Sequence, residues 1–175
     1  MVHTILVSIL VFASGPSAAA QHVHPAPPAS QARAQGTSTL SAEEVRQLLD
    51  GDGAGMAKAA EIHGYPGPKH ILERAEHLGL TATQRDLVTT IRGRMLAEAQ
   101  RLGRAIVEQE QALDAAFQSK AITREDLAAR VSRIGALRAE LRAVHLAAHL
   151  ESVTALTSEQ VHAYYQMGAH GAQRK

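Results

Sequence analysis

Two histidines with the spacing of metal ligands lie in the second of two long predicted helices. His145 and His149 are four residues apart, so on a helix their imidazoles lie on one face, a single turn apart. Both fall within the apolar stripe of that helix, where histidine is unusual. This spacing is common for two ligands of Zn(II), Ni(II), Co(II) or Cu(II). The chain contains no cysteine, so a metal site would use His, Met and carboxylate ligands.

A hairpin that turns near residues 120 and 121 brings further ligands within reach of this pair. His145 then lies opposite about residue 96, with Met95 on the facing apolar stripe and Glu98 on its edge. A carboxylate or a thioether can complete a histidine site. The first part of the chain offers other candidates, which are His63 and His70 on either side of a proline turn, and His77.

A purely structural role for the two histidines is the alternative. On the inner face of a helix they can hydrogen-bond to Glu98, Gln100 or a backbone carbonyl instead of a metal. The sequence leaves both roles open.

Catalysis is not expected. The hydrolytic pattern His-Glu-x-x-His is absent, because Leu146 follows His145 and no glutamate lies between the histidines. No nucleophile and base are paired in the sequence, and there is no Walker loop. The chain therefore needs no cofactor for a reaction, and Zn, Ni, Co or Cu remain the only ligands that the residues indicate.

The elements that position the histidines form an all-α protein built on a long antiparallel helical hairpin. The first long helix is predicted from Thr81 to about Gln118, the turn at residues 119–122, and the second helix after the cap residue Thr123. Apolar residues recur at spacings of three and four on one narrow stripe of each helix, which favours shallow-angle packing. The stripes contain Val88, Ile91, Met95, Leu102, Ile106, Leu113 and Phe117, then Leu127, Val131, Ile134, Leu137, Leu141 and Val144.

Short helices flank the hairpin. Ser41 to Glu44 form a capping box for a helix that stops at Gly51, and a glycine-rich joint of residues 51–55 follows. Brief helices are expected at residues 56–63 and 69–78, and a last one at residues 157–167. A hairpin this thin leaves one apolar side exposed unless these helices or a second subunit cover it.

The sequence Leu-Thr-x-x-Gln occurs at both ends of the hairpin. Leu80, Thr81 and Gln84 form the first copy, and the second consists of Leu156, Thr157 and Gln160. Each copy is a helix start, in which the threonine caps the helix, the glutamine reaches back to the cap residue's N–H group and the leucine precedes them as a staple. One such box is common, but two that bracket a long helical pair are more specific.

These motifs resemble the periplasmic LTXXQ-motif family, which includes the Spy and CpxP chaperones and the metal-responsive ZraP and CnrX proteins. The resemblance covers about residues 62–168, including the lead-in at residues 64–68. It implies a small helical envelope protein without catalytic activity, usually a homodimer shaped like a cradle. In the metal-sensing relatives a His and a Met at this spacing help to bind nickel or cobalt. Here His145 matches the first, and His149 replaces the second.

The N-terminal segment predicts export. A short apolar run at residues 4–13 is followed by Gly15 and Pro16, and then by three alanines before Gln21. This pattern predicts a signal peptide of residues 1–20 and a periplasmic location, with a retained membrane anchor as the alternative. Residues 21–39 are expected to be a disordered linker, residues 40–168 the helical domain and residues 169–175 a flexible tail. His22 and His24 could chelate Cu(II) or Ni(II) with the new α-amino group, and the alternative, which the composition of this arm favours, is two solvated histidines in a disordered segment.

The leading expectation is an ATP-independent chaperone or stress-protection protein that holds partly unfolded envelope proteins. Long arginine side chains would line the client-binding face, and those expected there are Arg85, Arg92, Arg94, Arg138 and Arg142. The alternatives are a periplasmic metal sensor or resistance protein and a regulatory module that docks on a sensor kinase or another membrane regulator. The formal charge of +1 and the lack of a dense basic patch argue against nucleic-acid binding.

Overall fold

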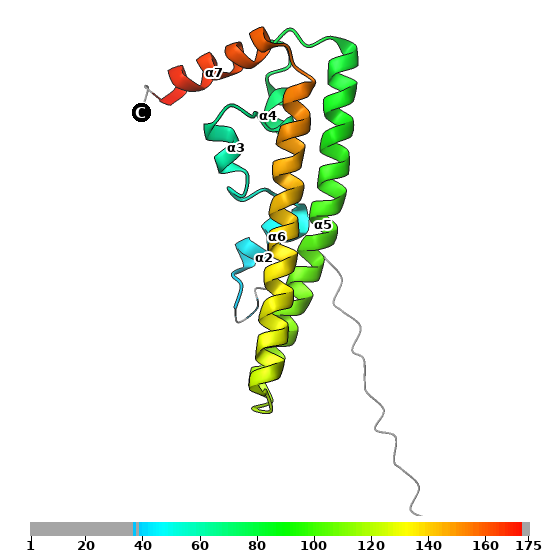
Figure 1. Cartoon of the computed structure of the whole chain (residues 1–175), viewed down its shortest axis with the longest axis vertical. Helices are drawn as coiled ribbons and strands as arrows, with labels where there is room; N and C mark the ends of the chain where they lie inside the picture. The colour runs from blue at the N-terminus through cyan, green and yellow to red at the C-terminus, as the bar shows by residue number, and fades with distance from the viewer. Residues whose placement is uncertain (1–36, 38, 173–175) are drawn as a thin grey trace, which may run out of the picture.

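The computed structural model describes residues 37 and 39–172, and these residues form helices without strands. The helices are α2 (Ala42–Asp50), α3 (Lys58–Ile62), α4 (Pro68–Glu73), α5 (Ala82–Gln118), α6 (Arg124–Thr154) and α7 (Ser158–Ala172). The long helices α5 and α6 run side by side in opposite directions, while α2, α3 and α4 follow one another along their length and α7 projects from the upper end (Figure 1). The predicted all-α class and the long helical pair are confirmed. No helix among the described residues is long and apolar enough to span a membrane.

Several predicted boundaries differ from the observed ones. Helix α3 is shorter than the predicted helix at residues 56–63, since no side chain caps its start. Helix α4 ends at Glu73, and the chain continues to Gly79 in tight turns that still bury Ala75 and Leu78. Helix α7 runs to Ala172, past the predicted end at residue 167 and into the segment expected as a tail.

The N-terminal predictions lie mostly outside the described residues. These are the signal peptide, His22 and His24 and the linker up to residue 36, and at the other end the tail at residues 173–175. The linker was predicted to extend to Thr39 and the helical domain to begin at Leu40, where the first contacts with the hairpin are found. The Thr39 hydroxyl donates to Glu110 Oε2 at 3.2 Å, and Leu40 is buried in the core.

Both Leu-Thr-x-x-Gln motifs form the predicted capping boxes. The N–H groups of Gln84 and Gln160 each donate to the threonine hydroxyl of their own motif at 3.2 Å. In return the N–H groups of Thr81 and Thr157 donate to the glutamine Oε1 atoms at 3.0 and 2.9 Å. The starts of α5 and α7 are thereby satisfied within their own sequence.

The two glutamines also bond to each other, which the sequence did not predict. Gln84 Nε2 donates to Gln160 Oε1 at 2.8 Å, and Gln160 Nε2 donates to Gln84 Oε1 at 3.2 Å. Their remaining amide protons go to the backbone carbonyls of Ala155 at 2.9 Å and Leu78 at 3.1 Å. We call this arrangement the glutamine joint. It ties the start of α5 to the end of α6 and the start of α7.

Two apolar cores lie along the hairpin. In the first, α2 packs Val45, Leu48 and Leu49 onto Leu102 and Ile106 of α5, with Leu137 and Leu141 of α6 in the same cluster. In the second, the chain around α4 packs against the start of α5 and the end of α6; its buried members are Ile71, Ala75, Leu78, Leu80, Val88 and Ala155. The covering helices therefore hold the hairpin at two separate places.

The first core depends on the absence of a side chain at Gly103. A Cβ atom at this position would lie 1.9 Å from the carbonyl oxygen of Leu48, which is far inside van der Waals contact. Only glycine lets α2 approach α5 this closely. Gly93, on the same helix, has open space where a Cβ would be, so the close approach is local.

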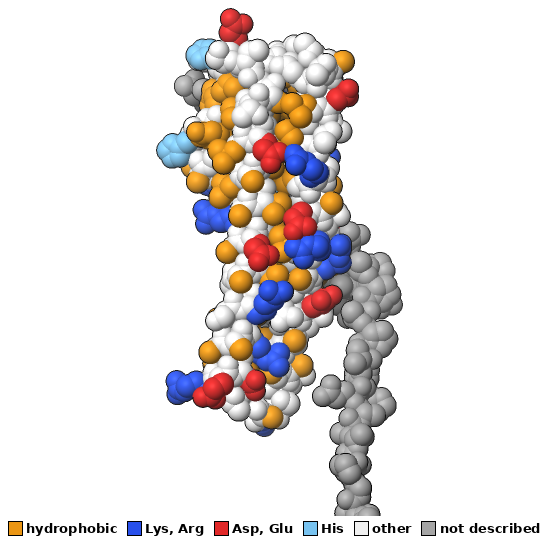
Figure 2. Space-filling model, turned by 45° about the vertical axis from the view of Figure 1, so that its right-hand side comes forward, with side chains coloured by type: hydrophobic (Ala, Val, Ile, Leu, Met, Phe, Trp, Pro, Cys, Tyr) orange, Lys and Arg blue, Asp and Glu red, His pale blue; other side chains and the backbone are white. Residues whose placement is uncertain are grey.

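The apolar stripe continues beyond α2 without a cover. Near the turn of the hairpin, Phe117 and Val131 are each 52% exposed, and Leu127 is also exposed. We call these three residues the distal stripe. In the view of Figure 2, charged side chains of both signs lie along the hairpin with small hydrophobic ones between them, and hydrophobic side chains gather toward the upper end.

The glutamine joint leads to a prediction about stability. The variants Gln84→Ala and Gln160→Ala should each lower the free energy of unfolding by about 1–3 kcal/mol, because the remaining amide and a backbone carbonyl lose their partners. The loss of free energy of unfolding in the double variant should be clearly smaller than the sum of the two single losses, since either change alone already breaks the joint. Urea unfolding of the four proteins measures this coupling, with Gln118→Ala on the exposed end of α5 as the control. If the two single losses simply added up in the double variant, the reciprocal bonds between the glutamines would be contradicted.

Candidate functional site

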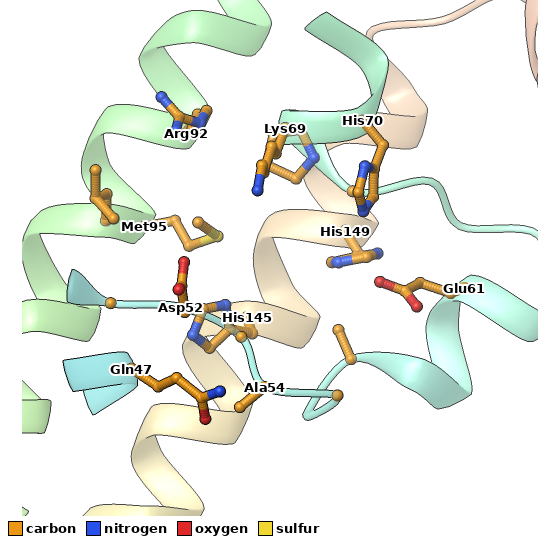
Figure 3. Close-up of a pocket in the computed structure, with 17 residues that line it drawn as sticks. Gln47, Asp52, Ala54, Glu61, Lys69, His70, Arg92, Met95, His145 and His149 are labelled. Carbon is orange, nitrogen blue, oxygen red and sulfur yellow. The ribbon is translucent and has the colours of Figure 1, made fainter. Parts of the chain in front are cut away.

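A cavity of about 350 Å³ lies beside the hairpin between the two cores. Figure 3 shows Met95 and Arg92 reaching it from α5, Lys69 and His70 from α4, and His145 and His149 from α6. The end of α2 and the segment after it form the floor with Gln47, Asp52 and three glycines. The cavity thus combines side chains from every element that packs on this side of the hairpin.

His149 is held in a defined orientation. Its side chain is 6% exposed, and Nδ1 lies 2.7 Å from the carbonyl oxygen of Tyr65. A carbonyl can only accept, so Nδ1 carries a proton, and Nε2 is the ring nitrogen left to face a ligand. This is the arrangement by which metal-binding histidines are commonly oriented, although it also satisfies a histidine with a purely structural role.

His145 is more deeply buried and less satisfied. It is 3% exposed, and its Nε2 has no hydrogen-bond partner among the described residues. Burial lowers the pKa of His145 below 6.5, the neighbouring His149 lowers it further, and the carboxylate of Asp52 acts in the opposite direction. The imidazole is therefore neutral at pH 7, with a nitrogen that lacks a partner in a cavity wall. Leaving such a group unpaired costs about 1–3 kcal/mol.

The covering segment lies directly against both histidines, and at Gly67 this approach leaves no room for a side chain. A Cβ atom on Gly67 would lie 2.7 Å from Cε1 and Nε2 of His149, and one on Gly53 would lie 3.4 Å from Nδ1 of His145. The backbone itself therefore forms part of the cavity wall next to each ring. Any ligand on these nitrogens must share this space with residues 53 and 67.

The structure brings only some of the predicted metal ligands together. Four of them line the cavity: His145, His149, Met95 and His70. Nδ1 of His70 pairs with Glu73 at 2.9 Å, so Nε2 is the nitrogen of this ring that is left to bind a metal. Two predictions are wrong. Glu98 does not line the cavity but forms a two-bonded ion pair with Arg101 at 2.9 and 2.6 Å, because it lies one turn away on the outer edge of α5.

His63 is the second wrong prediction. It is exposed at the end of α3 and does not line the cavity, since α3 ends before the proline turn. His77 is exposed as well and lies outside the lining. Among the described residues, no group of three or more His, Cys, Asp or Glu side chains is arranged to hold a metal ion.

The predicted client-binding arginines do not form one surface in the single chain. Arg92 lines the histidine cavity, whereas Arg94 pairs with Glu151 and lines a second, smaller hollow between α5 and α6. Arg138 pairs with the buried Glu110 at 2.9 Å. Arg85 is half-buried and Arg142 is exposed.

Sequence reasoning missed much of the cavity wall. Asp52, Gln47, Lys69 and Glu61 all line the cavity but lie far from the histidines in sequence. The glycines at residues 51–55 were interpreted as a flexible joint, yet Gly53 lies against His145. The one sequence signal for this part of the wall was the run of alternate glycines at residues 51–55 around Asp52, because glycine allows a close approach of the backbone.

Comparison with models of protein families, with curated proteins and with solved structures gives no match for this chain. The interpretation of the site therefore depends on its own geometry.

The burial of His145 predicts a dependence of stability on pH. The unfolded chain takes up a proton near the ordinary pKa of 6.5, and the folded site does so only at lower pH. The contribution of the neutral His145 to the free energy of unfolding is therefore fully present above pH 6.5, and it is lost as the pH falls from 6.5 through the folded-state pKa. Urea unfolding between pH 8 and pH 5 should show a smaller loss for His145→Gln than for the unchanged protein.

His77→Gln, which changes an exposed histidine outside the cavity, is the matched control and should follow the unchanged protein. If the two variants lose stability equally on acidification, the buried imidazole is not responsible for the pH dependence.

Proposed function

We propose that this protein is an ATP-independent envelope chaperone that holds partly unfolded proteins, as the resemblance to the Spy and CpxP chaperones implies. The observation that carries the proposal is the distal stripe, in which three large apolar side chains stay exposed on a thin hairpin. Exposed apolar side chains grouped on one element are a common feature of protein-binding surfaces. The chain has no Walker loop, so client release would not use ATP.

The distal stripe continues the surface on which α2 already packs. Leu102 and Ile106 of α5 bind the apolar side of α2, and Phe117 extends the same stripe toward the turn. Arg130, which is half-buried, donates to the carbonyl of Ala112 nearby. An apolar stripe bordered by arginine stems suits weak binding of varied hydrophobic segments.

A light-scattering assay of the aggregation of reduced α-lactalbumin tests the proposal. The protein should suppress aggregation, and Phe117→Gln with Val131→Gln should lower this suppression several-fold. Both side chains are exposed, so the fold should persist, as circular dichroism would verify. The matched control is Ala97→Gln with Ala115→Gln, two exposed positions elsewhere on α5. An unchanged protein that does not suppress aggregation would refute the proposed function.

Metal binding by the histidine cavity is the second candidate. It is supported by the oriented His149, whose Nδ1 is bonded to Tyr65, and by the buried Nε2 of His145, which finds no partner in the described part of the chain. Met95 and His70 line the same cavity. Two imidazoles with a thioether nearby suit Cu, Zn, Ni or Co, in line with the metal-responsive relatives that the motifs resemble.

Calorimetric titration of the untagged protein with Zn(II), Ni(II), Co(II) and Cu(II) tests this candidate. Metal binding at the cavity should be stoichiometric and should be lost in His145→Ala with His149→Ala, while His63→Ala with His77→Ala should retain it. The cavity double variant should also keep its suppression of aggregation, because the distal stripe is unchanged. Equal binding by both double variants would place the metal elsewhere.

A further inference from the structure

Charged side chains of both signs line the histidine cavity. Lys69 and Arg92 supply the positive charges, and Asp52 and Glu61 supply the negative ones. In the view of Figure 3, the two cationic side chains lie on the upper side of the cavity and the two carboxylates lie below them. The formal charges of these four residues cancel, but the two signs occupy different sides of the cavity.

The protein itself leaves most of these charges without a counter-ion. Lys69, Arg92 and Glu61 form no ion pair within the described part of the chain. Asp52 lies 3.7 Å from Arg46, and the two side chains are 50% and 44% exposed. Such an exposed pair contributes little, and a carboxylate can accept from several donors. Both signs therefore remain available to a ligand.

A buried group on the carboxylate side of the cavity also lacks a partner. His145 is 3% exposed, it lines the cavity, and its Nε2 has no hydrogen-bond partner among the described residues. The carboxylate of Asp52 acts electrostatically on this ring. When the proton of the neutral ring is on Nδ1, Nε2 is an acceptor. A cationic N–H donor on this side of the cavity would satisfy both Asp52 and His145.

We propose that the cavity binds a small zwitterion, either a free amino acid or a dipeptide, with its carboxylate at Arg92 and Lys69 and its ammonium group at Asp52 and His145. The planar guanidinium group of Arg92 suits the carboxylate, to which it can donate two parallel hydrogen bonds. The proposal goes beyond the proposed function, because it requires neither an unfolded client nor a metal ion.

The size and the apolar part of the wall suit such a ligand. The cavity has a volume of about 350 Å³, which is near the lower end of the range of about 300–1,000 Å³ found for small-molecule sites. Pro68, Met95 and Leu96 add apolar surface to the charged lining. An aliphatic side chain between the two charged ends would be buried against them, so leucine is the natural first probe.

Ligands with charge of only one sign fit this wall less well. Inorganic phosphate would find Lys69 and Arg92, but it would also face the carboxylates of Asp52 and Glu61, which repel it. A polyamine would meet the opposite difficulty at the two cationic side chains. Charges that attract one ligand and repel its competitors give specificity, and here they select a ligand that carries both signs.

Calorimetric titration of the full chain in metal-free buffer tests the proposal, with L-leucine and the dipeptide alanyl-leucine as probes. At least one of the two should bind stoichiometrically. Isocaproate lacks the amino group of leucine and isoamylamine lacks its carboxylate. Each of these analogues should bind about tenfold more weakly than leucine, because one charged end of the cavity stays without a partner.

Charge-removing variants locate the site. Arg92→Gln and Asp52→Asn should each raise the dissociation constant of the tighter probe about tenfold, since each removes one charged partner. Arg104→Gln and Asp86→Asn change exposed residues of α5 outside the cavity and should bind as the unchanged protein does. Arg46→Gln removes the ion pair of Asp52 but keeps its carboxylate, so it should retain binding.

Binding that both cavity variants weaken would support the proposal, and the tighter probe would tell a free amino acid from a peptide. No binding of either probe, or binding of isocaproate as tight as that of leucine, would overturn it. Circular dichroism verifies that each variant is folded. Suppression of aggregation and metal binding are measured separately, so failure of the zwitterion site and failure of the proposed function remain distinguishable.

Discussion

The reciprocal bonds between Gln84 and Gln160 fix where both ends of the hairpin lie. Each Oε1 accepts from its own cap residue and from the other glutamine, and each Nε2 donates to the other glutamine and to a backbone carbonyl. The oxygen and the nitrogen of both side-chain amides are thus fully used. A polar network is stabilising when every member has its partners. Here the network joins the start of α5 to the end of α6 and the start of α7, and its members are 71 and 76 residues apart in sequence.

This constraint matters because the hairpin is thin. Two helices with one narrow stripe each cannot surround a core, so the remaining apolar area must be covered by the short helices before them. Helix α2 covers the middle through the close contact at Gly103, and α4 covers the joined end. The cavity lies in the interval between these covers, and the distal stripe lies beyond them. Both candidate sites are therefore consequences of incomplete cover.

Periodicity predicted the helical pair, its turn and the capping boxes, because these depend on local spacing and on side-chain bonds within four residues. It did not predict the glutamine joint, since the two amides are 76 residues apart. The errors at the site have other causes. Glu98 was placed by helical geometry alone, and its competing partner Arg101 lies on the same helix. His63 was placed by assuming a position for a turn whose packing depends on α3 and α4.

Helix α6 presents different side chains on its different sides. Leu137 and Leu141 face α5 in the first core, whereas His145 and His149 face the covering segment. Because one helix holds both sets, the packing of its leucines also sets where the two imidazoles meet residues 53 and 67. The position of the histidine cavity therefore depends on the same core that holds α2 on the hairpin.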